Sequence, residues 1–206
     1  MANGKLTSVL RNSFLLLFLL VSCKAKNDHT ANDFQACNNF KSGDIICRLG
    51  NGFFSEYFKN MSPGEKKYSH VGVICKDGSN IDVIHTEASE LTGVGFVKKE
   101  SMETFLKEIE VWGVYRLKAN EEIQLAITQW AKAYLAKKTP FDLNFNSSND
   151  NELYCTELVA NCINKSFGNR VIKPTIAKNK PAVLYVSDIY LNPMFEPVFT
   201  SGRVRK

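Results

Sequence analysis

Two apolar, β-branched segments separated by a short polar turn constrain the fold of this chain most strongly. They run over 69–75 (Ser-His-Val-Gly-Val-Ile-Cys) and 80–87 (Asn-Ile-Asp-Val-Ile-His-Thr-Glu), with Lys-Asp-Gly-Ser between them. A short polar connection with a glycine joins antiparallel strands, whereas parallel strands need a long crossover. The pattern therefore predicts a β-hairpin within an antiparallel sheet.

The rest of the chain alternates between strand and helix patterns. The predicted strands are 44–49, 94–98, 110–117 and 195–200, the last an edge strand because it contains Pro197. The predicted helices are 52–60, a short one capped by Ser101, a long one capped by Asn120, one over about 153–167 that ends on Gly168, and one turn after Ser187-Asp188. We therefore expect an α+β fold.

The long helix after Asn120 carries an apolar stripe. Ile123, Ile127, Trp130 and Tyr134 recur at helical spacing on one face. Such a stripe is typical of a helix packed on a core, and we interpret it as core rather than as a cofactor site.

The amino terminus has the pattern of an export signal. Lys5 and Arg11 precede an apolar run of eight residues at 14–21, well short of the ~20 residues that span a bilayer. The run ends in Leu-Val-Ser-Cys, which resembles a bacterial lipobox with Cys23 as the lipidated residue; an ordinary signal peptide with an incidental cysteine is the alternative. We expect a lipoprotein signal at 1–22, a polar tether at 23–40 and one folded domain at 41–206, lipid-anchored in the bacterial cell envelope.

The charge balance argues against a nucleic-acid partner. The chain has 26 basic and 21 acidic residues, and removal of Lys5 and Arg11 with the signal leaves 24 minus 21, or +3. Basic residues are spread among acidic ones, without a run of five or six like charges. At 44% apolar and 23% charged residues, the composition is that of a folded globular domain.

Five cysteines remain after Cys23, an odd number. They show no Cys-x-x-Cys pair and are accompanied by few histidines, so we expect neither a metal site nor a cofactor. Cys47 and Cys75 end apolar strands and are interpreted as buried. How the five pair, if they do, is left open; they are Cys37, Cys47, Cys75, Cys155 and Cys162.

Cys155 falls in the first turn of the helix predicted at 153–167, after the capping candidates Asn149, Asp150 and Asn151. Unpaired backbone N–H groups at a helix start favour a thiolate and lower the pKa of a cysteine. The position therefore suits a nucleophile. The alternative is a core cysteine, because Cys155 shares a helical stripe with Leu158 and Cys162, and for Cys162 only the core interpretation applies.

A thiol nucleophile needs a base, and the base needs an orienting partner. His70 opens one strand of the predicted hairpin, and His85 and Glu87 share a face of the other. Strand periodicity alone leaves either of these two free to contact the ring of His70. The three places together predict a relay of Cys155, His70 and an acid or a second histidine.

Three segments resemble the signatures of papain-like NlpC-type cell-wall hydrolases. They are Gly43-Asp44-Ile45-Ile46, the Ser-His-Val-Gly-Val-Ile run at 69–74, and the Tyr-Cys-Thr-Glu-Leu-Val run at 154–159. In the ordinary members the cysteine helix comes first, whereas here it comes last. The chain therefore resembles the circularly permuted papain-like amidase group named after YaeF and YiiX, over roughly 41–200.

The resemblance implies Cys155 as nucleophile, His70 as general base and Glu87 as the residue that orients His70. His85 is the competing orienter, because ordinary NlpC-type enzymes often have a second histidine there. The resemblance also implies a cysteine amidase or peptidase acting on peptidoglycan stem peptides or N-acyl amino acid compounds. An acyltransferase using the same thiol, or a catalytically silent binding lipoprotein of the envelope, are the alternatives.

Overall fold

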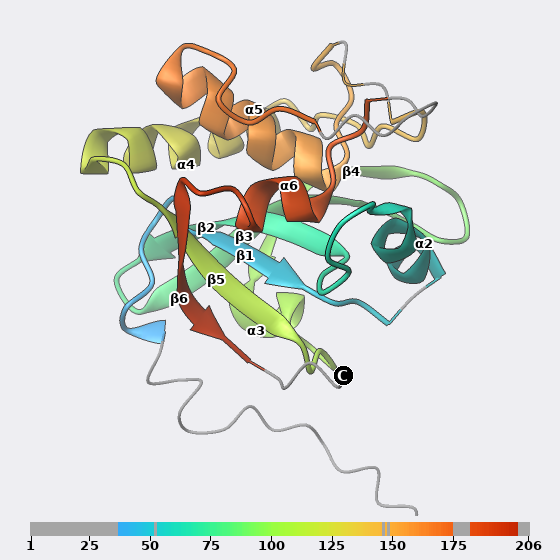
Figure 1. Ribbon diagram of the computed structural model, residues 1–206, viewed down its shortest axis with the longest axis horizontal. Helices are drawn as coiled ribbons and strands as arrows, with labels where there is room; N and C mark the ends of the chain where they lie inside the picture. The colour runs from blue at the N-terminus through green and yellow to red at the C-terminus, as the bar shows by residue number, and fades with distance from the viewer. Residues whose placement is uncertain (1–36, 52, 146, 148, 175–181, 202–206) are drawn as a thin grey trace, which may run out of the picture.

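The computed structural model describes residues 37–51, 53–145, 147, 149–174 and 182–201 as a mixed fold around one antiparallel sheet (Figure 1). The six strands are β1 (Ile45–Arg48), β2 (His70–Asp77), β3 (Asn80–Ala88), β4 (Gly95–Ser101), β5 (Trp112–Leu117) and β6 (Phe195–Thr200). They lie in the order β4-β3-β2-β1-β5-β6, and every neighbouring pair is antiparallel. The predicted α+β class is confirmed.

Helices cover both faces of this sheet. They are α2 (Phe53–Met61), α3 (Met102–Phe105), α4 (Glu121–Ala136), α5 (Cys155–Phe167) and α6 (Val186–Tyr190). The side chains of α4, α5 and α6 pack on the sheet face that carries Val71 and Val73, whereas α3 packs on the opposite face, with Ile46 and Ile74. Figure 1 shows α4, α5 and α6 together on one side of the sheet and α3 on the other.

The predicted hairpin is present, with a tighter turn than expected. β2 and β3 pair as far as Asp77 and Asn80, so that only Gly78 and Ser79 connect them. Gly78 has a φ of 57°, in the left-handed region that glycine adopts without strain. The tight turn fixes the register of the two strands, and through it the spacing of the residues at their far ends.

The predicted caps hold in part. Asn120 accepts from the Ile123 N–H at 3.0 Å, Ser101 accepts from the Thr104 N–H at 3.1 Å, and Gly168 closes α5 with a φ of 65°. The prediction that Trp130 belongs to the core face of α4 is wrong. Trp130 is 39% exposed, and its ring lies under the Lys165 ammonium. The helix turns Gln124, Thr128 and Ala131 inward instead.

Phe40, directly before the expected start of the domain at Lys41, belongs to the core. Phe40 is 1% exposed and packs edge-on against Trp112 and Phe199 in the core beneath α3. The predicted signal and Cys23 lie outside the described residues. Among the helices described, none has the length and apolarity needed to cross a bilayer.

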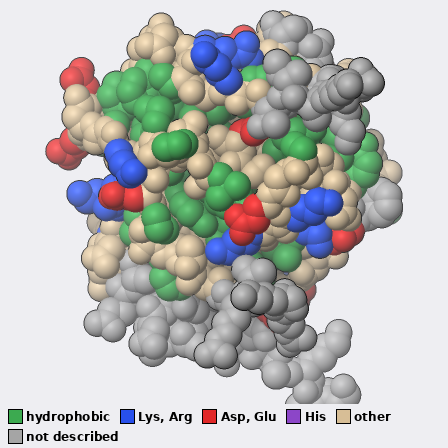
Figure 2. Space-filling view, viewed as in Figure 1, with side chains coloured by type: hydrophobic (Ala, Val, Ile, Leu, Met, Phe, Trp, Pro, Cys, Tyr) green, Lys and Arg blue, Asp and Glu red, His purple; other side chains and the backbone are tan. Residues whose placement is uncertain are grey.

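On the face seen in Figure 2, acidic and basic side chains are interspersed with hydrophobic ones, and neither sign forms a broad area. No disulfide bond joins any two of the described cysteines, and Cys47, Cys75 and Cys162 are buried as expected.

Candidate active site

The two strands of the hairpin separate at the end opposite its turn. β2 pairs with β3 only from Val73–Ile84 to Asp77–Asn80, while its pairing with β1 continues to His70. A cavity of about 340 Å³ opens at this end. It is lined by Ser55, Tyr57, Phe58, Ser69, His70, Glu87, Ala88, Glu90, Phe141, Leu143, Phe145 and Cys155.

Helix α5 brings its first residue, Cys155, to this cavity. Tyr154 is the N-cap and makes no side-chain capping bond, so the capping expected from 149–151 is wrong. The Tyr154 hydroxyl instead accepts from the Leu184 N–H at 2.9 Å and contacts the Ser147 hydroxyl at 3.1 Å. The helix therefore starts without a cap from the side chain of its N-cap residue, and the Cys155 thiol lies at this start.

The pKa of Cys155 differs from the expectation. Burial raises the pKa of this thiol, and hydrogen bonds from the Thr156 hydroxyl and from the N–H groups of Val71 and Thr156 lower it by less. With 3% of the residue exposed, desolvation of the thiolate outweighs the helix terminus. Cys155 therefore keeps its proton at neutral pH and needs a base to become a nucleophile.

His70 is placed to be that base, since it lines the same cavity as Cys155. Burial, and then the charge of the neighbouring Arg48, hold the pKa of His70 well below its usual range. The ring is thus neutral at pH 7 and has a nitrogen able to accept a proton. Nε2 of His70 is hydrogen-bonded to Nδ1 of His85 at 2.8 Å, so Nδ1 of His70 is the other ring nitrogen.

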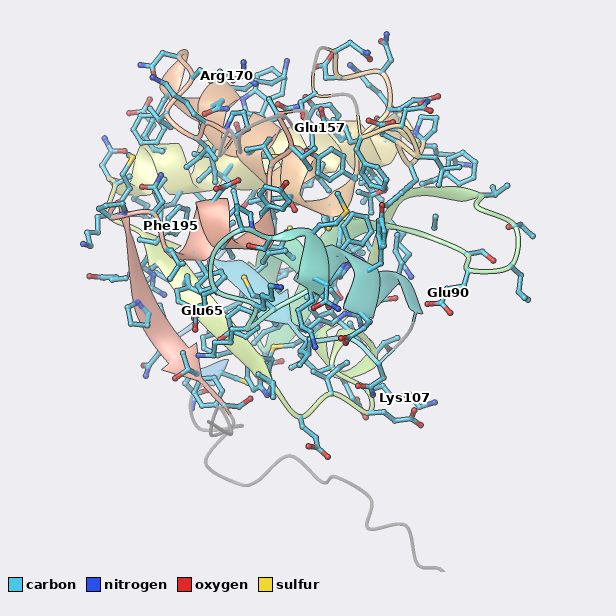
Figure 3. All side chains as sticks on the ribbon, turned by 45° about the vertical axis from the view of Figure 1, so that its right-hand side comes forward. Glu65, Glu90, Lys107, Glu157, Arg170 and Phe195 are labelled. Carbon is cyan, nitrogen blue, oxygen red and sulfur yellow. The ribbon has the colours of Figure 1, made fainter. Side chains whose placement is uncertain are left out.

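The contact that we expected Glu87 to make with His70 is made by His85. Glu87 accepts from Arg48 Nη2 at 2.8 Å and from Lys98 Nζ at 3.0 Å, and within the described residues no hydrogen bond joins it to His70. The Glu87 carboxylate therefore forms ion pairs with the two cations on either side of it. Glu87 still lines the cavity, as does Glu90 in the loop between β3 and β4 (Figure 3).

A second carboxylate lies behind the two histidines. His85 is fully buried, and its Nε2 lies 3.1 Å from Oε1 of Glu100 on β4. Contacts with His85, and secondarily Lys98, lower the pKa of Glu100 to about 2. Burial lowers the pKa of His85 although Glu100 opposes this shift. At neutral pH the Glu100 carboxylate is therefore an anion, and it faces the neutral imidazole ring of His85.

Packing fixes the two rings in place. Phe105 lies against both, with ring centroids 5.7 Å from His70 and 5.0 Å from His85, and Arg48 stacks over it at 4.4 Å. Gly72 gives the rings room, because a Cβ there would lie 2.6 Å from Val83 Cγ1 and 3.1 Å from His85 Cβ.

Sequence reasoning missed Arg48, Phe105 and Glu100. Arg48 pairs with His70 across β1 and β2, and Glu100 pairs with Val83 across β3 and β4. Both positions follow from strand register, which the sequence pattern alone does not supply.

The site combines a cysteine at the start of a helix, a neutral imidazole that lines the same cavity, and a second side chain that contacts this imidazole at 2.8 Å. These are the parts of a cysteine hydrolase of papain type. In this chain β2, which carries the base His70, precedes α5, which carries the nucleophile Cys155. Residues 39–186 match the family described as permuted papain-like amidase enzyme, YaeF/YiiX, C92 family. The chain belongs to this family, and it is a papain-like cysteine hydrolase.

The fold agrees with a solved structure. The chain is similar to the crystal structure of metalloprotein yiiX from Escherichia coli O157:H7, with a TM-score of 0.64 and 21% identity over 79% of this chain and 98% of that one. No curated protein gave a match. In the described part of the present chain, no group of three or more His, Cys, Asp or Glu side chains is arranged to hold a metal ion.

Proposed function

We propose that the protein hydrolyses an amide bond through an acyl-enzyme on Cys155. The observation that carries the proposal is the 2.8 Å contact of His70 with His85, at a cavity that His70 shares with the Cys155 thiol. His70 takes the thiol proton as Sγ attacks the amide carbonyl, and then gives that proton to the leaving amine. Water, activated by His70, releases the acyl group and restores the thiol.

The oxyanion of the tetrahedral intermediate needs hydrogen-bond donors. The backbone N–H of Cys155, at the uncapped start of α5, is the first. Ser69 is the candidate for the second, because it lines the cavity beside His70 and its Oγ already accepts from the Gly50 N–H at 3.0 Å, which leaves the hydroxyl hydrogen to donate.

The cavity favours one of the two substrate classes. One wall consists of apolar and aromatic side chains, namely Tyr57, Phe58, Phe141, Leu143 and Phe145. An apolar acyl group buries well against such a wall, whereas the polar amide backbone of a cell-wall peptide would lose hydration there. We therefore propose N-acyl amino acid compounds ahead of peptidoglycan stem peptides.

Hydrolysis is tested with coumarin amides of N-acyl amino acids. We expect Cys155→Ala to abolish release of the fluorophore while the fold persists, because the covalent route needs the sulfur. Cys162→Ala is the matched control, a thiol two turns along the same helix and fully buried; it should lose stability and keep activity. Equal loss in well-folded forms of both variants would contradict the assignment.

Product analysis separates hydrolysis from its alternatives. An acyltransferase would pass the acyl group from Cys155 to an added amine, and the new amide would be seen by mass spectrometry. A silent binding protein would retain substrate without forming either product.

We also propose that Cys23 carries a lipid anchor and that the enzyme works at the bacterial cell envelope. The support is the apolar run before Leu20-Val21-Ser22-Cys23. Cys23→Ser should move the protein from the detergent-extracted membrane fraction to the soluble one, because loss of several acyl chains removes stable anchoring. Retention in the membrane fraction would contradict the proposal.

A further inference from the structure

The chain of contacts that starts at His70 does not end at His85. His85 Nε2 is a buried nitrogen without an aligned hydrogen bond in the described part of the chain, and Glu100 Oε1 lies 3.1 Å from it. An ionised carboxylate can only accept hydrogen bonds. A hydrogen on Nε2 of His85 places a partial positive charge toward the Glu100 carboxylate at 3.1 Å, whereas a lone pair there would face a negative charge.

We infer that Glu100 is a positioning residue that fixes the tautomers of both histidines, and thereby decides which nitrogen of His70 receives the proton of Cys155. The inference rests on the proposed function for the role of His70. It adds a fourth residue, on a third strand, to the three that carry the reaction.

The tautomers follow in sequence from the carboxylate. A neutral imidazole carries one N–H, so His85 with hydrogen on Nε2 has a lone pair on Nδ1. That lone pair lies 2.8 Å from Nε2 of His70 and must accept from it. His70 then carries its hydrogen on Nε2 and its lone pair on Nδ1, the nitrogen left for Cys155.

One proton moves in the step that uses this arrangement. The S–H bond of Cys155 breaks, the proton forms a bond to Nδ1 of His70, and the electron pair stays on sulfur. His70 becomes an imidazolium whose Nε2–H remains donated to His85, and neither His85 nor Glu100 gains or loses a proton. Glu100 stabilises the new positive charge through the intervening ring.

The charges around Glu100 limit this effect without cancelling it. Lys98 Nζ lies 3.4 Å from Glu100 Oε2, but it also lies 3.0 Å from Glu87 Oε2, and Arg48 contacts Glu87. Two cations thus face two carboxylates around the two rings. The Glu100 side chain is 19% exposed, so solvent screens it only in part.

The test uses three variants of the full chain. Glu100→Leu removes the acceptor, and Glu100→Gln keeps an acceptor oxygen without the charge. Asp82→Leu is the matched control, since Asp82 pairs with Lys99 at 2.7 Å across the same two strands, and strand alternation turns both away from the face of His85 and Glu100.

The first readout is the nitrogen-15 NMR spectrum of histidine-labelled protein, which distinguishes the two tautomers directly; the chain has only three histidines. We expect His70 and His85 to carry hydrogen on Nε2 in the wild type, in Glu100→Gln and in Asp82→Leu. Glu100→Leu should leave His85 as a mixture of tautomers. A wild-type His85 with hydrogen on Nδ1 overturns the inference without any variant.

The second readout is the rate at which iodoacetamide modifies Cys155 at pH 7. We expect a loss on the order of 10-fold in Glu100→Leu, a smaller loss in Glu100→Gln, and no change in Asp82→Leu. Unchanged tautomers and rate in Glu100→Leu, or an equal loss in Asp82→Leu, overturn the inference. If Glu100→Leu does not fold, the wild-type spectrum and Glu100→Gln decide. Absence of amide hydrolysis in the wild type would refute the proposed function and leave the tautomer result standing.

Discussion

The two ends of the β2–β3 hairpin differ in strand pairing and in burial. At the turn, the strands stay paired to Asp77 and Asn80 and close through two residues. At the other end, pairing stops at Val73 and Ile84, and the strands separate around two buried histidines. The first end fixes register, and the second uses that register to place chemistry.

The difference shows where this fold accepts a free-energy cost. The open end buries two neutral imidazoles beside the charges of Arg48, Lys98 and Glu100, whereas at the paired end Asp77 is exposed to water and Lys76 is half-buried. Burial of polar groups without full hydrogen bonding is unfavourable, and such sites are where function is found. Changes at the open end should therefore alter chemistry, and changes at the paired end should alter only stability.

Among the variants that compare the two ends, His85→Leu has the largest expected effect. His85→Leu leaves the Nε2–H of His70 without its acceptor, so the base loses orientation and the support of its charged form. We expect kcat/KM on a coumarin amide to fall on the order of 10² to 10⁴, by analogy with loss of the orienting group in a catalytic triad.

Glu87→Gln is the comparison for His85→Leu, because it alters the residue that the sequence favoured. It removes a charge that pairs with Arg48 and Lys98, and we expect a loss below about tenfold. A larger loss in Glu87→Gln than in His85→Leu would restore Glu87 as the orienting residue.

Two glycines sharpen the contrast between the ends. In Gly72→Ala, the new Cβ meets Val83 and His85, so we expect about 1 to 3 kcal/mol of destabilisation and a loss of activity on the order of 10-fold. In Gly78→Ala, no atom lies within 4 Å of the new Cβ but φ is positive, so about 1 kcal/mol should be lost, and activity kept. Denaturant unfolding measures the stability of both variants, and kcat/KM measures their activity. Full activity in Gly72→Ala would contradict the claim that the open end is tightly packed.

Stability alone, without a substitution, should also depend on pH. The folded pKa values of His70 and His85 are depressed, so their contribution is complete above the unfolded value of about 6.5 and is lost as pH falls toward the folded values. Glu100, also depressed, begins to lose its contribution only below about 4.5.

Between pH 6.5 and 5 the histidines therefore dominate, and the free energy of unfolding should fall by on the order of 2 kcal/mol. Combining His70→Gln with His85→Gln should flatten this slope. A slope that persists in the double variant would place its origin in other groups.

The sequence predicted those features that depend on local pattern. Strand alternation, the polar turn, the capping side chains of Asn120 and Ser101, and the glycine at the end of α5 each specify a local conformation, and all appear in the structure. His70 and Cys155 were expected to meet because the family signatures occur together, and both line the cavity.

The remaining features depend on tertiary context. His85 and Glu87 share a strand face, so strand periodicity alone could not show which of them contacts His70. The choice depends on the separation of β2 from β3 and on the cations that pair with Glu87. The pKa of Cys155 depends on how deeply α5 is buried, which outweighs the effect of the helix start. Trp130 follows the helical period of the core but is 39% exposed, because α4 turns another side inward.

The central claim is that Cys155 holds its proton at rest and loses it to His70. Mass spectrometry of iodoacetamide labelling from pH 5 to 10 tests it site by site, in the wild type and in His70→Gln. We predict that Cys155 is labelled far faster than buried Cys162, with a midpoint above the ordinary value of about 8.5, and that His70→Gln slows its labelling at pH 7 on the order of 10-fold or more. Labelling of Cys155 no faster than Cys162, or a rate unchanged in His70→Gln, would contradict the account.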